Sequence, residues 1–447
     1  MNARQVVENA LDKGHGILRL APNWVPRVFC IPGRRICLHP DDYEKLGAAR
    51  GGIDERWFAS TTETKNAVRP SDEGLSYIFY QDGSRIRKAT LRAGVEEHRS
   101  AIVGRRLWEA FQRWPMYSKF FDNMGPLPHH VHHRDEHAAR TNQDGKPEAY
   151  YFPPQRNNHP GDRDSTYFGI NPGTTKDQLR ECIRIFLDGE GDNGIVDIAH
   201  SHKLKAGTGW NVPAGVLHAP GSMCTYEPQY ASDVFSMYQS VVEGRQMVPL
   251  ELFLKDTPEN ILSKDQLKKA KRKQKITDPN LKEALIEWFV EVLDWEKNVD
   301  PNFVQNSFME PWPVQSPEQI ERLGYVNKWI CYLSDAFSAN ELTVKPRHTA
   351  RLEEDTTSPY GFIVMQGHAN INGMLFEAPT MIRYGQLTND EGYVTPRAIA
   401  GGLEIKNLSD RDDFVILRHY AGGNKALPAF MATQAGLPSI FLTNSTT

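Results

Sequence analysis

The chain has 447 residues, of which 39% are hydrophobic and 24% are charged, the composition of an ordinary globular protein. This length predicts two domains, or one domain with a helical insert. The formal net charge of -4 gives no reason to expect a nucleic-acid partner, and a small polar or anionic metabolite fits it better. No run of about 18 apolar residues occurs, so we expect no membrane partner and no membrane span.

Cysteine usage bears on the cellular compartment. The five cysteines are odd in number and lack the C-x-x-C spacing of a redox or metal motif. We interpret them as reduced thiols, which are typical of a cytosolic protein. The first residues lack the apolar segment of a secretory signal, so the expected location is the cytoplasm. The sequence leaves the oligomeric state open, and a homodimer is one alternative.

The N-terminal half is predicted to consist mostly of short strands. A helix is expected from Arg4 to Leu11, followed by strands and a hairpin around the turn at residues 81–83. Residues 94–112 have helical periodicity. Residues 174–187 have the clearest helix pattern in this half, because a capping box precedes apolar residues at helical spacing.

The C-terminal half has a helical pattern first and a strand pattern after it. Residues 255–300 are charged and helical in pattern, with one apolar stripe. We interpret the basic run inside them as a solvated helix face, because acidic residues lie beside it. Another helix is expected near Ile320 to Phe337. Strand patterns return from about Pro346 to Tyr420, and these residues are typical of a second β-barrel.

Potential metal ligands are concentrated in residues 125–153. His130 and His132 alternate in an expected strand, so both imidazoles face the same side. Glu148 lies in a second expected strand, joined to the first through a Gly-containing turn. Ligands of this kind hold a divalent metal and leave a position open for substrate. Glu136 is the alternative carboxylate ligand.

A second motif supplies the fourth candidate ligand. Residues 207–218, GTGWNVPAGVLH, have the spacing G-x5-P-x-G-x2-H, in which Pro and Gly form a tight turn and the next strand carries His218 inward. Together with the His130-x-His132 pair, this spacing resembles the two motifs of the cupin superfamily. Single histidines are usually structural, so the prediction rests on the combination.

Most of the chain also resembles the type I mannose-6-phosphate isomerases. The resemblance rests on His132, on the Lys-x-Glu strand with Lys146 and Glu148, on the Pro-x-Gly-x2-His-Ala turn that contains His218, and on Glu227 nine residues later. A Ser-Asp pair follows that glutamate, as it does in the family.

The resemblance implies a mainly β fold with helical insertions. We expect two cupin-type β-barrels, each a double-stranded β-helix, with a helical segment between them. The corresponding segments are an N-terminal metal-binding cupin domain at 1–254, a helical segment at 255–345 and a degenerate cupin-like barrel at 346–447.

Two positions depart from the family pattern. The family has Gln where this chain has His130, so the expected ligand set contains three histidines and a carboxylate. Zinc is the expected ion, with iron, manganese and nickel as alternatives. The active-site Arg of the family falls at Met237, which leaves Arg245, Arg134 or Lys146 as candidate replacements.

The resemblance implies a metal-dependent isomerase that interconverts an aldose and a ketose through an enediol, with a sugar or a sugar phosphate as substrate. Glu227 is the candidate base, because a carboxylate in a dry barrel has a raised pKa. Lys146 and Arg245 are the other expected catalytic residues. Two alternatives stay open: a cupin oxidoreductase or dioxygenase, and a non-catalytic sugar-binding regulatory protein.

Overall fold

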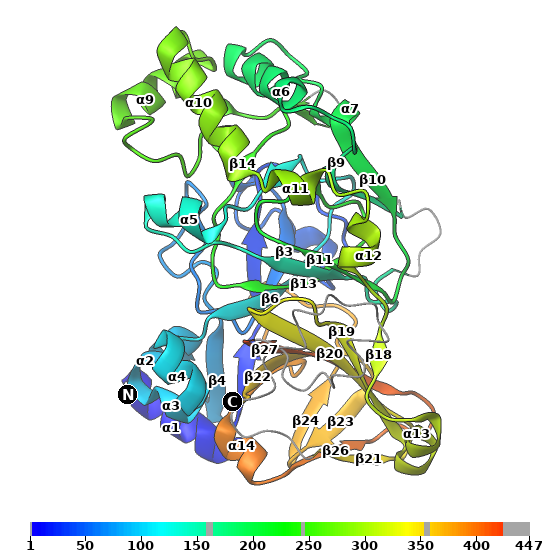
Figure 1. Cartoon of the computed structure of the whole chain (residues 1–447). Helices are drawn as coiled ribbons and strands as arrows, with labels where there is room; N and C mark the ends of the chain where they lie inside the picture. The colour runs from blue at the N-terminus through cyan, green and yellow to red at the C-terminus, as the bar shows by residue number, and fades with distance from the viewer. Residues whose placement is uncertain (1, 158–163, 243–245, 353–357, 423–447) are drawn as a thin grey trace.

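A computed structural model describes residues 2–157, 164–242, 246–352 and 358–422 of the chain. Within these residues, sheets of five, seven, nine and four strands are stacked in that order, with helices over the outer face of the five-stranded sheet (Figure 1). A two-stranded ribbon of β15 (Val241–Val242) and β16 (Gln246–Met247) completes the sheets. The fold is therefore mainly β with helical insertions, as the sequence predicts.

The five-stranded sheet carries the histidine motifs. Its strands, in spatial order, are β10 (Ala199–Lys203), β9 (Ser165–Ile170), β12 (His218–Ala219), β7 (His130–Val131) and β14 (Ser236–Met237). The antiparallel register sets His218 opposite His130 on one side, and Met237 opposite His130 on the other. Residues from three distant parts of the sequence thus lie side by side.

The seven-stranded sheet lies between two other sheets. Its strands, in spatial order, are β17 (Phe308–Met309), β11 (Gly209–Val212), β8 (Glu148–Tyr151), β13 (Thr225–Tyr230), β6 (Met116–Phe121), β3 (Ile53–Phe58) and β2 (Asn23–Pro26). Every residue of β3 and β6 is buried, because both faces of this sheet are covered.

Alternation along the strands of this sheet separates two sets of contacts. In β3, Glu55 faces the five-stranded sheet, whereas the next residue, Arg56, reaches Asp390 next to the nine-stranded sheet. In β13, Glu227 likewise faces the five-stranded sheet, and Tyr226 contacts the nine-stranded sheet. The period of two along a strand thus directs alternate residues towards the five-stranded and the nine-stranded sheets.

The nine-stranded sheet mixes both ends of the chain. Its strands, in spatial order, are β18 (Trp312–Pro313), β19 (Tyr325–Cys331), β20 (Phe337–Val344), β27 (Phe414–Ala421), β22 (Tyr360–Gln366), β25 (Glu391–Val394), β1 (Ile17–Ala21), β4 (Tyr77–Asp82) and β5 (Arg85–Thr90). The four-stranded sheet covers its far face with β21 (Thr349–Leu352), β26 (Leu403–Asn407), β23 (His368–Ile371) and β24 (Met374–Glu377). Residues 1–254 therefore contribute strands to both large sheets, and the division into two barrels and three segments stays a prediction.

Four longer helices follow their sequence signals. Helix α1 (Ala3–Lys13) and helix α6 (Lys176–Asp188) both begin at a capping box, where a side chain accepts from a backbone N–H of the first turn. Helices α9 (Lys264–Lys273) and α10 (Pro279–Val292) confirm the predicted helical character of residues 255–300. In space they cover the outer face of the five-stranded sheet (Figure 1).

The remaining described helices are short. They are α2 (Leu91–His98), α3 (Ser100–Val103), α4 (Arg105–Phe111), α5 (Asp135–Ala138), α7 (Ile195–Ile198), α8 (Leu250–Phe253), α11 (Trp295–Asn298), α12 (Phe303–Ser307), α13 (Pro317–Leu323) and α14 (Pro396–Ala400), with single turns η1 (Pro40–Asp42), η2 (Ala48–Arg50) and η3 (Ala139–Thr141). None of the helices in the described ranges has the length and apolar character that a membrane crossing requires.

The helix expected near residues 320–337 is wrong. Helix α13 ends at Leu323, where Gly324 adopts a left-handed conformation with φ 69°, and strand β19 follows from Tyr325. The strand is stabilised by antiparallel pairing with β20, which the local pattern does not reveal.

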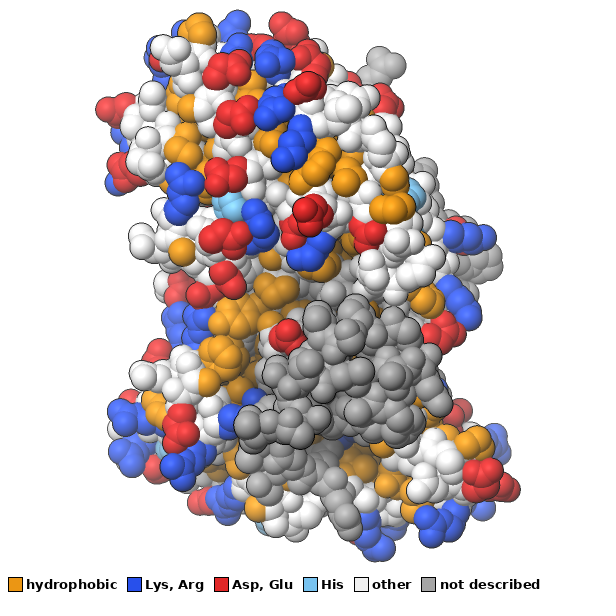
Figure 2. Space-filling view, viewed as in Figure 1, with side chains coloured by type: hydrophobic (Ala, Val, Ile, Leu, Met, Phe, Trp, Pro, Cys, Tyr) orange, Lys and Arg blue, Asp and Glu red, His pale blue; other side chains and the backbone are white. Residues whose placement is uncertain are grey.

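Charged side chains of both signs are mixed over the helical end of the molecule (Figure 2). Lys271 of α9, for example, pairs with Glu251 at the surface. The basic run in α9 is thus a solvated helix face, as predicted.

Arg56 should be a major contributor to stability. It is buried and makes two hydrogen bonds to Asp390, of 2.7 and 2.9 Å, so Arg56→Met leaves a buried carboxylate without its counter-charge. We expect the free energy of unfolding to fall by about 3–5 kcal/mol, measured by urea denaturation followed by tryptophan fluorescence. The control Arg180→Ala breaks a more exposed pair with Glu287 and should cost about 1 kcal/mol or less. Equal losses in the two variants would contradict the assignment.

Candidate metal centre

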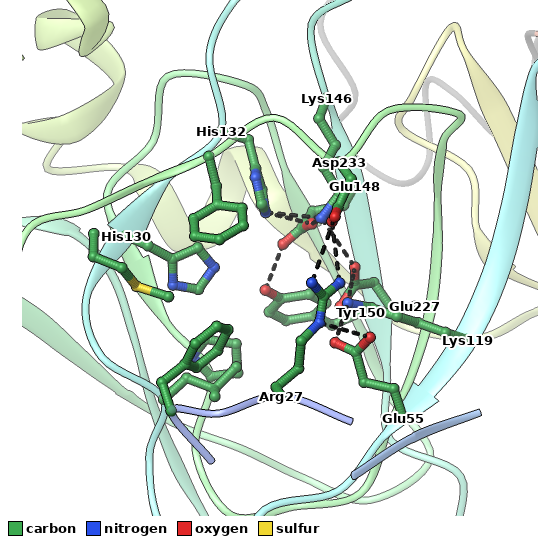
Figure 3. A pocket seen from close by; sticks show the side chains of 15 residues that line it. Arg27, Glu55, Lys119, His130, His132, Lys146, Glu148, Tyr150, Glu227 and Asp233 are labelled. Atoms are coloured by element: carbon green, nitrogen blue, oxygen red, sulfur yellow. Dashed lines mark hydrogen bonds and ion pairs between the residues drawn. The ribbon is translucent and has the colours of Figure 1, made fainter. Parts of the chain in front are cut away.

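A small polar cavity lies between the five-stranded and seven-stranded sheets (Figure 3). Its volume is about 40 Å³. The side chains around it are Arg27, Phe29, Glu55, Lys119, Leu127, His130, His132, Lys146, Glu148, Tyr150, Pro220, Glu227, Asp233, Phe235 and Met237. The two sheets contribute different chemistry, with imidazoles from one and most of the charged groups from the other.

Three histidines converge beside this cavity. His130 lies on β7, His132 follows that strand, and His218 lies on the neighbouring β12. All three are buried, and each offers a ring nitrogen within 4.8 Å of the others. The centroids of the rings of His130 and His218 are 4.1 Å apart. The structure thus brings together the histidines that the two motifs indicate.

The backbone fixes the orientation of each ring. The Nδ1–H groups of His130, His132 and His218 point at the carbonyl oxygens of Pro128, Val234 and Val216, at 2.8, 2.7 and 2.8 Å. Donation from Nδ1 leaves Nε2 as a lone pair directed inward, which is the tautomer that a metal ligand needs. Burial lowers the pKa of His132 to about 4, so this ring is neutral near pH 7.

Glu148 completes the group from the opposite sheet. Its Oε2 lies 3.0 Å from Nε2 of His132, and its Oε1 lies 3.1 Å from Nε2 of His218. The hydroxyl of Tyr150 donates to the same carboxylate at 2.5 Å. Burial raises the pKa of Glu148, but the ammonium of Lys146, 2.8 Å from Oε2, helps to hold that pKa well below its ordinary value.

These donors fit a divalent metal. A buried carboxylate and two Nε2 lone pairs within 3.1 Å repel one another unless a positive charge lies among them. The ammonium of Lys146 supplies part of that charge, at 2.9 Å from Nε2 of His132 and 2.8 Å from Oε2 of Glu148. Three imidazoles and one carboxylate suit zinc, iron, manganese or nickel.

The alternative carboxylate lies elsewhere. Glu136 is on α5, is 60% exposed in its side chain, and pairs with Arg134 at 3.0 Å. Arg134 itself donates to the carbonyl of Glu291 and is absent from the described lining of the cavity. Neither residue contributes to the site. Arg245, a further candidate replacement for the missing arginine, lies outside the described residues.

Glu227 faces the metal-ligand group across the cavity. It lies directly opposite Lys119 in the β13–β6 register, with Nζ of Lys119 at 3.3 Å and Nζ of Lys146 at 3.5 Å from Oε1. Burial, reinforced by the negative charge of Glu148, raises the pKa of Glu227 to about 8. Such a carboxyl group can both release and accept a proton near neutral pH.

The sequence motifs miss three charged groups of the site. Lys119 bridges to Glu55 of β3 at 3.0 Å, and Glu55 accepts from Nε of Arg27 at 3.2 Å. Arg27 follows β2 and also binds Asp233 at 3.1 Å (Figure 3). The alternation of residues along β3 and β6 is the one sequence signal that could have indicated that Glu55 and Lys119 point inward. The local sequence does not reveal that these two strands pair.

Known proteins resemble this chain in structure rather than in sequence. No protein-family model and no curated protein matches it. The mannose 6-phosphate isomerase of Bacillus subtilis is 15% identical, with a TM-score of 0.56 over 90% of this chain and 99% of that chain. A variant of phosphomannose isomerase from Salmonella typhimurium is 11% identical, with a TM-score of 0.56 over 91% and 100%.

A further solved structure, of a mannose 6-phosphate isomerase bound with zinc and yttrium, is 10% identical, with a TM-score of 0.54 over 91% of this chain and 100% of that chain. The likeness to mannose-6-phosphate isomerases that the sequence motifs indicate is thereby confirmed at the level of the fold.

The metal-ligand assignment is tested by removing one imidazole. We expect His132→Ala to lose the bound divalent metal, because one of three Nε2 donors is removed, and elemental analysis of the purified protein measures the loss. His200→Ala is the control, since His200 lies on β10, outside the group, and should keep its metal. Full metal content in His132→Ala would refute the assignment.

Proposed function

We propose that this protein is a metal-dependent aldose–ketose isomerase that acts on a sugar or sugar phosphate. One observation carries the proposal: three buried imidazoles and Glu148 form a metal-ligand group that faces a second carboxyl group, Glu227, across a cavity. The shared fold with mannose-6-phosphate isomerases supports it. Aldose–ketose isomerisation needs both an electrophile at the substrate oxygens and a base at the adjacent carbon.

His130, His132, His218 and Glu148 would hold one divalent metal, for which zinc is the expected ion. A bound metal supplies Lewis acidity, which polarises the carbonyl and hydroxyl oxygens of a sugar. Every one of the four residues is buried. Burial lowers the local dielectric constant and strengthens each electrostatic interaction among these residues.

Glu227 is the proposed base. Its carboxylate would remove the proton from the carbon next to the carbonyl and return it to the former carbonyl carbon. The proton of the adjacent hydroxyl group would move to the former carbonyl oxygen, so that an aldose becomes a ketose. Lys119 and Lys146 both contact Oε1, so they hold the carboxylate in place and favour its ionised form. Lys146 also contacts Glu148 and would orient that ligand. Arg245 stays a predicted catalytic residue.

One observation favours a second candidate, a metal-dependent oxidoreductase or dioxygenase. His130 replaces the glutamine of the isomerase pattern, and a three-histidine set also suits iron, whose open positions bind oxygen. The metal content of the purified protein separates the two, since zinc has no redox chemistry. A non-catalytic sugar-binding protein would bind metal but exchange no substrate proton.

Glu227→Gln tests the base. The variant should keep its metal and lose at least about a hundredfold in the rate of deuterium incorporation at the carbon next to the carbonyl, because an amide cannot accept the proton. The assay follows aldoses incubated with the metal-loaded protein in deuterated water by NMR. Glu136→Gln is the matched control, since that carboxylate is exposed and remote, and unchanged exchange in Glu227→Gln would remove Glu227 from the mechanism.

The pH dependence follows from the same group. The pKa of Glu227 is raised to about 8, and the base must be ionised to act. Exchange should therefore rise with increasing pH and level off above about pH 8 in the wild-type protein, measured as kcat/KM across a buffer series. A rate that falls over that range would contradict the assignment of Glu227 as base.

A further inference from the structure

Every positive side chain around the described cavity is already engaged by buried carboxylates. Arg27 contacts Glu55 at 3.2 Å and Asp233 at 3.1 Å. Lys119 contacts Glu55 at 3.0 Å and Glu227 at 3.3 Å. The third cation, Lys146, contacts Glu148 and Glu227 at 2.8 and 3.5 Å. Three cations thus share four carboxylates.

The remaining wall of the cavity is apolar. It consists of Phe29, Leu127, Pro220, Phe235 and Met237, and the rings of Phe29 and Phe235 meet edge to face with centroids 6.2 Å apart. Met237 is 1% exposed and lies opposite His130 in the β14–β7 register. The position to which the family resemblance assigns an arginine therefore presents a thioether beside the metal-ligand group.

A phosphate ester would find no complementary group in this wall. Near pH 7 a phosphate monoester carries a charge between -1.5 and -2, and a buried charge is costly unless cations or hydrogen-bond donors pair with it. Within the described lining no residue belongs to a helix, so no helix N-terminus supplies backbone donors for an anion.

We propose that the site selects an uncharged sugar over its phosphate ester, with the apolar wall against the C–H face of the sugar and the polar wall around its hydroxyl groups. This inference rests on the proposed isomerase function and narrows its substrate class. Aromatic rings such as Phe29 and Phe235 stack on the apolar face of a sugar ring but offer nothing to a phosphate.

The first experiment compares matched substrates. Deuterium incorporation is measured for mannose and mannose 6-phosphate with the metal-loaded wild-type protein. We expect kcat/KM for mannose to exceed that for mannose 6-phosphate by at least about tenfold. A kcat/KM for mannose 6-phosphate equal to or above that for mannose overturns the inference while leaving the isomerase proposal intact.

Binding separates this inference from the isomerase proposal. Mannitol and mannitol 1-phosphate lack the carbonyl group, so they cannot react, and titration calorimetry measures their affinities whether or not the protein catalyses exchange. We expect mannitol to bind at least about tenfold more tightly. Tighter binding of mannitol 1-phosphate overturns the inference, even in a protein without isomerase activity.

An added cation in the apolar wall should shift the preference towards the phosphate ester. Met237→Arg places a guanidinium in the apolar wall and should raise the ratio of kcat/KM for mannose 6-phosphate to that for mannose at least about tenfold. Met237→Leu is the control and should keep the ratio of the wild-type protein. Phe29→Lys adds a cation at a half-buried position of the same wall. It provides the same test if Met237→Arg does not fold. An unchanged ratio in a folded cationic variant overturns the inference.

Discussion

The central constraint of this molecule is the close approach of one buried carboxylate to two imidazole lone pairs. Glu148 reaches His132 and His218 across the gap between two sheets, at 3.0 and 3.1 Å. Backbone carbonyls accept from the Nδ1–H groups, so the Nε2 atoms cannot donate to the carboxylate. Positive charge stabilises this arrangement, and the ammonium of Lys146 supplies part of it. Three imidazoles and a carboxylate also suit a divalent metal.

That constraint extends into the seven-stranded sheet. Carboxylates and cations alternate from Glu148 through Lys146, Glu227 and Lys119 to Glu55, and Arg27 with Asp233 continues the series. Buried charges are tolerated because each contacts a partner of opposite sign. The same strands place their other residues in the core beneath, so one sheet both supports the fold and carries the polar side of the cavity.

The positive side chains of this site are all paired with buried carboxylates among the described residues. The arginine that the family resemblance assigns to β14 is replaced by Met237, while Arg27 enters from β2 and is bound by two carboxylates. A cation with two carboxylate partners contributes to the rigidity of the site, but it is not available to an incoming anion. The replacement at Met237 thus leaves the three histidines and Glu148 in place while removing a positive charge from the wall of the cavity.

The sequence by itself predicted that His130, His132, His218 and Glu148 come together, and it located the capped helices. Strand alternation, turn spacing and capping boxes are local and appear in consecutive residues. Tertiary structure alone decided that Arg27 lies in the cavity, that Glu136 stays outside it, and that residues 325–331 form a strand. These outcomes depend on which strands pair and which faces meet. Strands pair so that side chains from segments far apart in the chain become buried against one another. A short sequence pattern does not specify which strands these are.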